Sequence, residues 1–381
     1  PLQAPPCGMY HMRRAIVTVT NDLVTDNRVH RTCVVLQELG YNVLLVGRVL
    51  PRSAVLDRPY ETKRMRLLFN KGALFYAEYN VRLFFLLLFS RFSLVVANDL
   101  DTLLAGFLAS KMKGGELVYD SHEYFTEVPE LAARPAVRRV WLSIERWIFP
   151  KLKKVITVND SIADAYKDRY GLRPAVVRNI PMPRELGALQ SRAELGLPTD
   201  RSILIMQGSG INVQRGAEEA VLAMKELPGC LLLLVGGGDA WPVLEQLVKD
   251  HGLADRVRML PRMPYEAMMQ YTRKADLGLS LDKDTNLNYR FSLPNKLFDY
   301  FRAGIPALVT DLPEVAGIVR KYDAGIVLPS PEPELIVEAV RKWAADAPRT
   351  AALRRNATFA AVSLDGQREL EALKAVFQEL G

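Results

Sequence analysis

The chain has 381 residues, of which 49% are hydrophobic and 24% are charged, and its formal net charge is +7. This length exceeds that of one ordinary hydrophobic core, so we expect two domains, and the composition excludes an intrinsically disordered chain. No stretch offers the roughly 18 uncharged apolar residues of a membrane-spanning helix, so we expect a cytoplasmic protein. Residues 1–12 lack the apolar core of a signal peptide, and we expect them to form a flexible tail.

The excess positive charge lies in the first half of the sequence. Through residue 190 there are 27 Lys and Arg against 18 Asp and Glu, whereas the remainder has 23 against 25. Such an excess suits an anionic partner such as an acidic membrane surface, and a solvated basic surface without a partner explains it equally well. Nucleic acid is the least attractive partner, because no aromatic platforms alternate with the basic residues.

Cysteine and histidine are scarce. The three cysteines Cys7, Cys33 and Cys230 are odd in number and widely spaced, which argues against a disulfide framework or a zinc site, so we expect structural roles for them. With only four histidines, a three-histidine metal site is improbable, and we expect no metal.

Short apolar segments alternate with helical patterns from residue 14 onward. Strands are predicted at 14–20, 42–47, 93–99, 116–123 and 154–160, and helices at 29–39, 101–113, 139–152 and 161–171. After a stretch rich in Pro and turn formers the alternation restarts, with strands at 202–208, 230–238, 257–260, 275–281, 305–310 and 324–328. This pattern predicts an α/β protein with two doubly wound parallel sheets, each covered by helices on both faces.

The same pattern predicts the domain organisation. We expect an N-terminal Rossmann-like domain over 13–185, a linker over 186–200 and a C-terminal Rossmann-like domain over 201–360. Residues 361–381 are predicted to form an amphipathic helix that could pack back toward the N-terminal domain.

Residues 81–92, VRLFFLLLFSRF, form an unusually apolar segment in which eight of the twelve are Leu or Phe. The segment is too short to span a bilayer. It is therefore either a helix that covers the core or a face that dips into a membrane surface, and the basic excess of the same half keeps the second reading open.

Ligands of open parallel sheets bind beyond the carboxyl ends of the strands, so the loops there are the first candidates for a site. The loop GSGINVQRGAEEA at 208–220 offers glycines, Arg215 and a helix start, which suits phosphate oxygens. Val213 stands where the dinucleotide fingerprint would have its third glycine, and an ordinary tight turn is the alternative. For the second glycine cluster, 236–238, close helix packing is the better explanation.

The segment SLPNKLFDYFRAGIP at 292–306 places Lys296 and Asp299 three residues apart on a predicted helix, and hence on one face. A lysine there could pair with a phosphate, while the carboxylate could accept hydrogen bonds from adjacent hydroxyls such as those of a ribose. A surface ion pair worth at most about 1 kcal/mol is the alternative. Ser292 and Asn295 add polar groups for a polyhydroxylated ligand.

These residues resemble glycosyltransferase family 4, whose members are retaining enzymes of the GT-B fold that use sugar nucleotides. The resemblance is carried by VGGGDAWPVLEQLVKDHGLADRVRMLPRMPYE and PNKLFDYFRAGIPALVTDLPE in the second half, and more loosely by ANDLDTLLAG, VYDSHEYF and VITVNDSIADAYKDRYG in the first. It implies two Rossmann-like domains that face each other across a cleft. It also implies a nucleoside-diphosphate sugar as co-substrate, no other cofactor, and a carbohydrate or lipid-linked acceptor.

The resemblance also implies roles for residues of the donor side. Asp299 matches the family's ribose-binding glutamate, Ser292 stands where an acidic residue usually contacts the donor sugar, and Arg215 matches one of two diphosphate-binding cations. The full donor set comprises Gly208, Ser209, Gly210, Arg215, Arg262, Met263, Ser292, Asn295, Lys296, Leu297 and Asp299. Arg262 and Met263 lie in the loop that matches the family's nucleobase contact.

On the acceptor side, DSHE matches the family's histidine beside the reacting sugar, which makes His122 the catalytic candidate. The family's glycine-rich first loop is replaced here, so we expect Asp26, Asn27 and Arg28 to line the acceptor side. Asn98 and Asp99 end a strand and are further candidates, although capping the next helix explains them equally well.

The family implies retention by front-face attack, with charge on the leaving diphosphate stabilised by Arg215, Lys296 and the helix start after Gly210. A sugar-nucleotide 2-epimerase and a non-catalytic nucleotide-sugar binding protein are the alternatives. The missing third glycine argues against a nicotinamide-dependent oxidoreductase.

Overall fold

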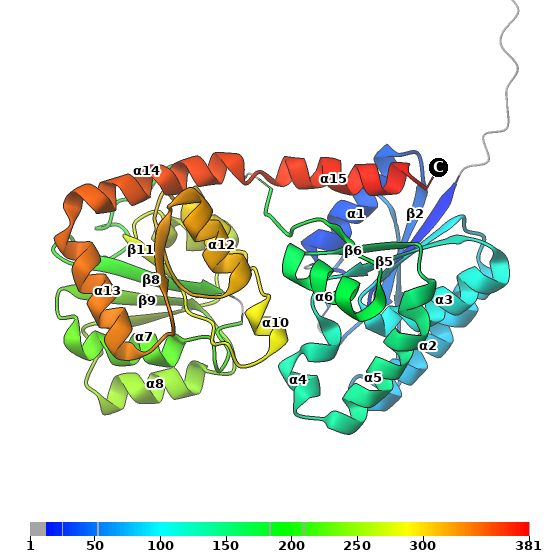
Figure 1. Ribbon diagram of the computed structural model, residues 1–381, viewed down its shortest axis with the longest axis horizontal. Helices are drawn as coiled ribbons and strands as arrows, with labels where there is room; N and C mark the ends of the chain where they lie inside the picture. The colour runs from blue at the N-terminus through cyan, green and yellow to red at the C-terminus, as the bar shows by residue number, and fades with distance from the viewer. Residues whose placement is uncertain (1–12, 25, 52, 183, 209, 381) are drawn as a thin grey trace, which may run out of the picture. The chain divides into compact units, whose positions relative to one another are not determined.

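The computed structural model describes residues 13–24, 26–51, 53–182, 184–208 and 210–380, which leaves the predicted tail and Ser209 outside the described residues. The chain divides into two compact units (Figure 1). Unit 1 runs to Arg178 and resumes from Arg368, and unit 2 spans Asn179–Gln367. Each unit is a parallel sheet between helices, so the predicted fold class is confirmed.

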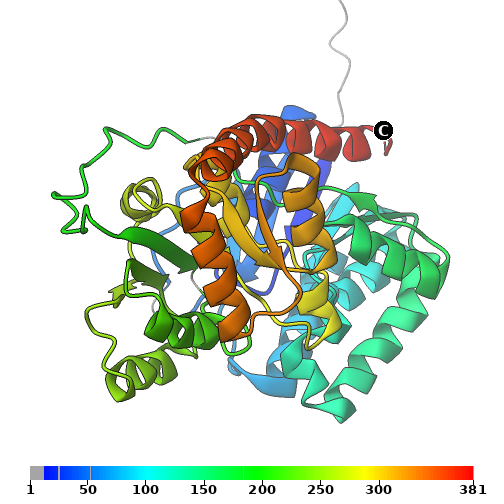
Figure 2. The same ribbon diagram turned by 60° about the vertical axis from the view of Figure 1, so that its left-hand side comes forward.

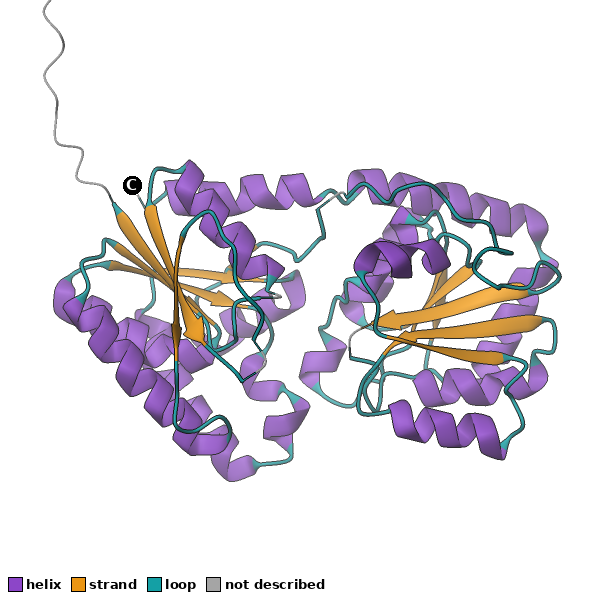
Figure 3. Cartoon of the chain, turned by 180° about the vertical axis from the view of Figure 1, so that it is seen from behind, coloured by secondary structure: helices purple, strands orange, loops and turns teal. Residues whose placement is uncertain are grey.

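Unit 1 contains a seven-stranded sheet in the order β3-β2-β1-β4-β5-β6-β7. Figure 3 draws the strands of both sheets in orange and the helices in purple. Its strands are β1 (Arg14–Thr18), β2 (Asn42–Arg48), β3 (Glu61–Met65), β4 (Leu94–Asn98), β5 (Glu116–Ser121), β6 (Lys154–Thr157) and β7 (Ala175–Val176). Its helices are α1 (Asn27–Glu38), α2 (Gly72–Phe89), α3 (Leu100–Lys113), α4 (Pro129–Ala132), α5 (Pro135–Ile148), α6 (Asp160–Tyr170) and α15 (Gly366–Gln378), with 3-10 turns at Phe125–Glu127 and Phe149–Lys151.

Strand β3 was not predicted from the sequence. Its residues ETKRM lack an apolar run, and all but Arg64 and Met65 are exposed. Backbone pairing with β2 rather than side-chain burial defines this edge strand.

Helix α15 completes the core of unit 1 although it follows unit 2 in the sequence. Leu373 and Phe377 are buried in the same cluster as Val29 and Cys33 of α1. The side chain of Glu369 also accepts a hydrogen bond of 2.7 Å from the backbone of Arg178, the last residue before the chain leaves this unit.

Unit 2 contains a six-stranded parallel sheet in the order β10-β9-β8-β11-β12-β13. Its strands are β8 (Ser202–Gly208), β9 (Cys230–Gly236), β10 (Val257–Pro261), β11 (Leu277–Ser280), β12 (Ala307–Thr310) and β13 (Gly325–Leu328). Its helices are α7 (Ala217–Ala223), α8 (Trp241–Asp250), α9 (Tyr265–Thr272), α10 (Leu287–Arg290), α11 (Lys296–Arg302), α12 (Pro313–Tyr322), α13 (Pro333–Ala345) and α14 (Ala347–Ser363), with a 3-10 turn at Met224–Glu226.

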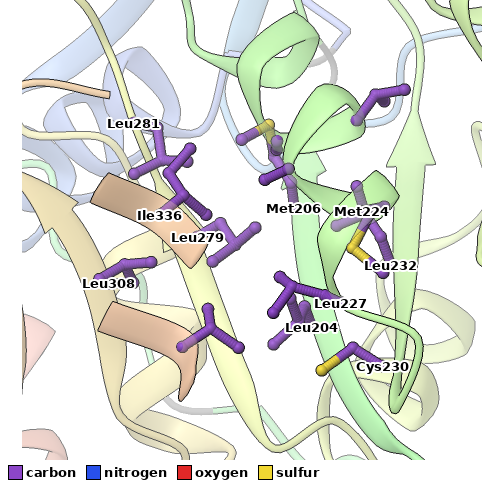
Figure 4. Close-up of a cluster of buried hydrophobic side chains, with 14 of the residues drawn as sticks. Leu204, Met206, Met224, Leu227, Cys230, Leu232, Leu279, Leu281, Leu308 and Ile336 are labelled. Atoms are coloured by element: carbon purple, nitrogen blue, oxygen red, sulfur yellow. The ribbon is translucent and has the colours of Figure 1, made fainter. Parts of the chain in front are cut away.

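The core of unit 2 lies on both faces of this sheet. One cluster joins Leu204 and Leu279 of the strands to Ile336 of α13, and Cys230 is buried at its edge (Figure 4). The other face packs against α11, α12 and α14. Figure 2 brings this unit forward, with α12 and α13 in orange.

The division of the chain differs from the predicted boundaries. Residues 186–200, predicted as a linker, belong to unit 2 because Leu197 is buried in its core and the Arg192 guanidinium donates to Asp276 at 2.8 Å. Composition marked these residues as loop, but it carried no sign of these long-range contacts.

Strand β11 and helix α11 are packed so closely that Gly278 has no room for a side chain. A Cβ built there would lie 2.3 Å from the ring of Tyr300, whose hydroxyl donates to the carbonyls of Ile205 and Leu279. This contact fixes α11, and with it Lys296, against the end of the sheet.

We therefore expect Gly278→Ala to lower the free energy of unfolding by about 1–3 kcal/mol, through overpacking against Tyr300. Gly317→Ala, in α12, is the matched control because a Cβ there meets nothing within 4 Å. That control should be neutral or slightly stabilising. Chemical denaturation of both variants checks the contact, and equal effects would contradict it.

Candidate active site

The carboxyl end of the sheet in unit 2 holds a cluster of three charged side chains. Asp282, just beyond β11, has a side chain only 1% exposed, and its Oδ1 accepts a hydrogen bond of 3.1 Å from Nη1 of Arg215. Lys296 opens α11 beside them. Burial lowers the pKa of Lys296, the Asp282 carboxylate opposes that effect, and Arg215 lowers it further. Arg215 is thus paired with the buried Asp282, and the same carboxylate favours the charged form of Lys296.

This cluster leaves hydrogen-bonding capacity unused. Oδ2 of Asp282 and Nε of Arg215 are buried without a hydrogen-bond partner in the described structure, and the same holds for Oγ of Ser292, which precedes Lys296 in the sequence. A buried polar atom without a partner costs about 1–3 kcal/mol, so such atoms mark a place where a polar ligand would be stabilising. The Arg215 guanidinium is further fixed 4.7 Å above the ring of Tyr289.

Lys296 and Asp299 form no ion pair with each other among the described residues, which argues against the alternative of a surface ion pair. The neighbours of Lys296 are Asp282 and Arg215, whereas Asp299 accepts hydrogen bonds from Tyr265 at 2.8 Å and Gln207 at 3.2 Å. Burial raises the pKa of Asp299, and its hydrogen bonds lower it. Two of the roughly four lone-pair positions of this carboxylate are thus used by the protein, which leaves capacity for a ligand hydroxyl.

The first glycine loop is shaped by close contact between backbones. At Gly216 φ is +76°, and a Cβ would lie 2.2 Å from the carbonyl oxygen of Leu281. This approach brings Arg215 against Asp282. The helix predicted in the segment GAEEA begins at Ala217, directly after the turn at Gly216. Glu218 and Glu219 occupy its first turn and add negative charge there, and phosphate binding at this helix start stays a prediction.

The second glycine cluster has the packing role that was preferred for it. A Cβ at Gly236 would lie 1.8 Å from the carbonyl oxygen of Gly208, and one at Gly238 would lie 2.1 Å from that of Ile211. At Gly237 a Cβ would lie 3.2 Å from Nε of Arg262, which places the Arg262 side chain beside this loop.

The remaining predicted donor residues differ in the solvent exposure of their side chains. Leu297 is fully buried in the core, so a ligand contact of this residue would have to involve its backbone. Met263 is half-buried and packs against the same core, and Asn295 is exposed at the start of α11. Ser209 lies outside the described residues.

The corresponding end of the sheet in unit 1 is organised around His122, which directly follows β5. Its Nε2 lies 3.0 Å from Oδ1 of Asn98 and 3.5 Å from Oδ2 of Asp120, and its Nδ1 lies 3.5 Å from Oδ2 of Asp99. Burial lowers the pKa of His122, but Asp99 and Asp120 outweigh it and raise the pKa to about 9. The ring is therefore an imidazolium near neutral pH, without a lone pair to accept a proton.

Asp99 does not cap helix α3 with its side chain, which removes the capping role considered for it. Its carboxylate makes no capping hydrogen bond, and its Oδ1 instead accepts the backbone N–H of His122 at 2.9 Å. The residue has φ +60°, a strained conformation that non-glycine residues adopt mainly where the surroundings enforce it. Asn98 is fully buried and donates to the carbonyl of Thr18.

Arg28 does not line an acceptor surface, contrary to prediction. Its buried guanidinium donates to both oxygens of Asp120, at 2.6 and 3.1 Å, and to the carbonyl of Val177. Burial opposes ionisation of Asp120, but Arg28 and His122 outweigh it and hold the pKa of Asp120 well below its usual range. Arg28 therefore fixes the position of the Asp120 carboxylate, which in turn stabilises the charged form of His122.

The two other residues predicted to line the acceptor side, Asp26 and Asn27, have different surroundings from Arg28. Asp26 is the N-cap of α1, since its Oδ1 accepts the backbone N–H of Val29 at 3.0 Å and its Oδ2 accepts from Asn21. Asn27 is exposed at the first turn of the same helix.

Sequence reasoning missed four polar residues of these two clusters: Asp101, Gln207, Tyr265 and Asp282. Asp101 accepts from the Thr20 hydroxyl at 2.6 Å, its Oδ1 has no partner among described residues, and burial and Asp99 raise its pKa to about 7. The available signal was position, because Asp101 and Asp282 each follow a buried strand within a few residues. No group of three or more His, Cys, Asp and Glu in the described part of the chain could hold a metal ion.

Known families match both parts of the sequence. The family described as Glycosyltransferase Family 4 matches residues 26–185, and the one described as Glycosyl transferases group 1 matches residues 189–358. The chain belongs to the family 4 type of glycosyltransferases. Both matched families are families of glycosyltransferases, as the resemblance implied.

Curated relatives of this glycosyltransferase match over short stretches. The D-inositol 3-phosphate glycosyltransferase of Mycobacteroides abscessus is 28% identical over 189 residues, which cover 45% of this chain and 42% of the relative. The enzyme of the same name from Mycolicibacterium smegmatis is 36% identical over 92 residues, or 23% of this chain and 21% of the relative. The matched stretch thus spans less than half of either relative.

Solved structures show the GT-B fold of this glycosyltransferase over nearly its full length. Sucrose-phosphate synthase from Thermosynechococcus elongatus has a TM-score of 0.78 at 18% identity and covers 97% of this chain and 99% of its own. HepE from Anabaena, solved in complex with UDP-glucose, has a TM-score of 0.70 at 16% identity and covers 96% and 99%.

The charge of His122 can be tested by NMR titration of its imidazole signals, assigned by comparison with His122→Ala. The folded-state pKa of about 9 lies above the ordinary 6.5, so the pairing stabilises the fold fully below about pH 6.5 and loses this effect as the pH rises through 9. We expect Asp99→Asn to lower the pKa of His122. Glu61→Gln, on edge strand β3, should leave it unchanged, and a wild-type pKa near 6.5 would contradict the assignment.

Proposed function

We propose that this glycosyltransferase transfers a sugar, with retention of configuration and without a metal ion, from a UDP-sugar to a hydroxyl group of a glycan or lipid-linked precursor in the cytoplasm. The proposal rests mainly on the buried cluster of Arg215, Asp282 and Lys296 at the carboxyl end of the unit 2 sheet. The solved complexes of HepE with UDP, glucose and UDP-glucose support uridine as the base.

The cluster suits a diphosphate leaving group. As the bond between the anomeric carbon and the β-phosphate oxygen breaks, its electron pair passes to the diphosphate, and negative charge grows there. Arg215 is held beforehand by Asp282, so it needs no reorganisation to stabilise that charge, and Lys296 adds a second positive group near the same carboxylate. Nε of Arg215 is buried without a hydrogen-bond partner and is therefore a donor that the protein leaves unused.

The acceptor hydroxyl forms the new bond to the anomeric carbon and must lose its proton. In the proposed front-face reaction a diphosphate oxygen takes that proton. The charged state of His122 supports this assignment, because an imidazolium whose two nitrogens face Asn98, Asp99 and Asp120 has no free lone pair. His122 then acts as a fixed positive group beside the acceptor rather than as a base.

Turnover distinguishes this function from the two alternatives. Release of UDP from UDP-glucose that depends on an added acceptor supports a transferase. Release with isomerisation of the sugar and without an acceptor would identify an epimerase, and binding without release would identify a non-catalytic binding protein. A panel of UDP-, GDP- and ADP-sugars tests the choice of base in the same assay.

We expect Lys296→Ala to weaken UDP binding about 10- to 100-fold in calorimetry, because it removes a charged contact to phosphate worth about 1.5–3 kcal/mol. Lys321→Ala, which removes an exposed lysine of α12, is the matched control and should bind UDP as the wild type does. Equal affinities for the two variants would remove Lys296 from the site.

We expect His122→Ala to lower kcat about 10²–10³-fold, as the loss of one fixed charge-stabilising group does in comparable sites. UDP affinity should stay within about twofold of wild type, because His122 belongs to unit 1 and the UDP cluster to unit 2. A parallel loss of affinity and kcat would contradict the separate roles.

A further inference from the structure

We propose that unit 1 docks on an anionic lipid surface through the exposed face of helix α2 and the loop before it. The proposal does not depend on the proposed function, because it concerns only unit 1 and requires no nucleotide. In this proposal the apolar segment noted in the sequence contacts the membrane surface peripherally.

Helix α2 has two apolar faces, and only one of them is covered. Phe75, Tyr79, Leu83 and Leu87 face the core of unit 1 and are buried there. The opposite face exposes Leu74 by 60%, Val81 by 56%, Phe85 by 49% and Phe89 by 83%. These four lie at spacings of seven and four residues, so they form one ridge along the helix. Water is a poor solvent for a continuous apolar ridge of this kind.

The loop before α2 extends this ridge. Leu68 is 79% exposed and Phe69 is 44% exposed. Their backbone N–H groups donate to the carboxylate of Glu78 at distances of 2.9–3.0 Å, and Glu78 also pairs with Arg82 one turn later. These hydrogen bonds hold the loop against the helix while its apolar side chains face the solvent. The charge of Glu78 is balanced by its ion pair with Arg82.

The charge around the ridge favours lipid headgroups over another protein copy. Between residues 62 and 92 there are six Lys and Arg against one acidic residue, Glu78. Arg66, Lys71 and Arg91 are exposed, and Lys113 lies over the end of the helix, where it donates to the carbonyls of Leu88 and Ser90. A surface of one charge sign repels its own copy and attracts phosphate headgroups.

The helix is placed to lie on a membrane rather than to cross it. Among the described residues α2 is the one helix long and apolar enough to span a bilayer by length and composition, with a mean hydropathy of 1.3 over 18 residues. If α2 spanned the bilayer, four of its residues would have to leave the core of unit 1: Phe75, Tyr79, Leu83 and Leu87. Docking by the exposed ridge leaves that core intact and inserts only side chains.

The test is sedimentation of the full chain with phosphatidylcholine vesicles, with and without phosphatidylglycerol, at low and high salt. We expect binding to the anionic vesicles alone, reduced at high salt. The double variant Phe85→Ser/Phe89→Ser should bind at least about fivefold less. Phe359→Ser/Val362→Ser, which removes two similarly exposed apolar residues of α14, is the matched control and should bind as the wild type does.

UDP binding by calorimetry and circular dichroism establish that each variant is folded, and they keep a failure here separate from a failure of the proposed function. Wild-type protein that does not sediment, or a Phe85→Ser/Phe89→Ser variant that sediments like the wild type, would overturn the proposal. Light scattering that shows a dimer broken by the same variant would overturn it in favour of a second copy.

Discussion

The charged clusters of both units depend on a buried carboxylate that must have a positive partner. Asp120 in unit 1 and Asp282 in unit 2 have side chains only about 1% exposed, and each is paired with an arginine at the carboxyl end of a parallel sheet. An unpaired charge in such a place would cost several kcal/mol, so each carboxylate fixes the positions of the cations around it. The sites are consequently arranged before any ligand arrives.

The two carboxylates are used differently. Asp120 is saturated by the bidentate guanidinium of Arg28 and by His122, so its cluster is closed and acts by keeping the imidazole charged and immobile. Asp282 still has one oxygen without a partner, and Arg215 still has one free donor atom. The second cluster is therefore open, which suits binding, whereas the first suits orientation.

The sequence predicted the elements better than the side-chain networks. Alternating apolar segments predicted both sheets, because burial on two faces leaves a clear pattern, and the segment NKLFDYF predicted a helix that does begin at Lys296. The sequence pattern could not show that Lys296 and Asp299 have different neighbours. Asp282, the neighbour of Lys296, lies just beyond the end of β11. Gln207, which donates to Asp299, lies on β8, 92 residues away in the sequence. Arg28 was misplaced for the same reason, since Asp120 lies 92 residues away.

Helix α15 has a consequence for the order in which the chain can fold. Because Leu373 and Phe377 fill the unit 1 core beside Val29 and Cys33, the half that leaves the ribosome first lacks part of its interior until unit 2 has been synthesised. During translation the later half can therefore reach its native packing before the earlier one. For the same reason a fragment that ends at Arg178 would expose apolar surface of α1. An isolated first half would need α15 joined to it in a rearranged chain order.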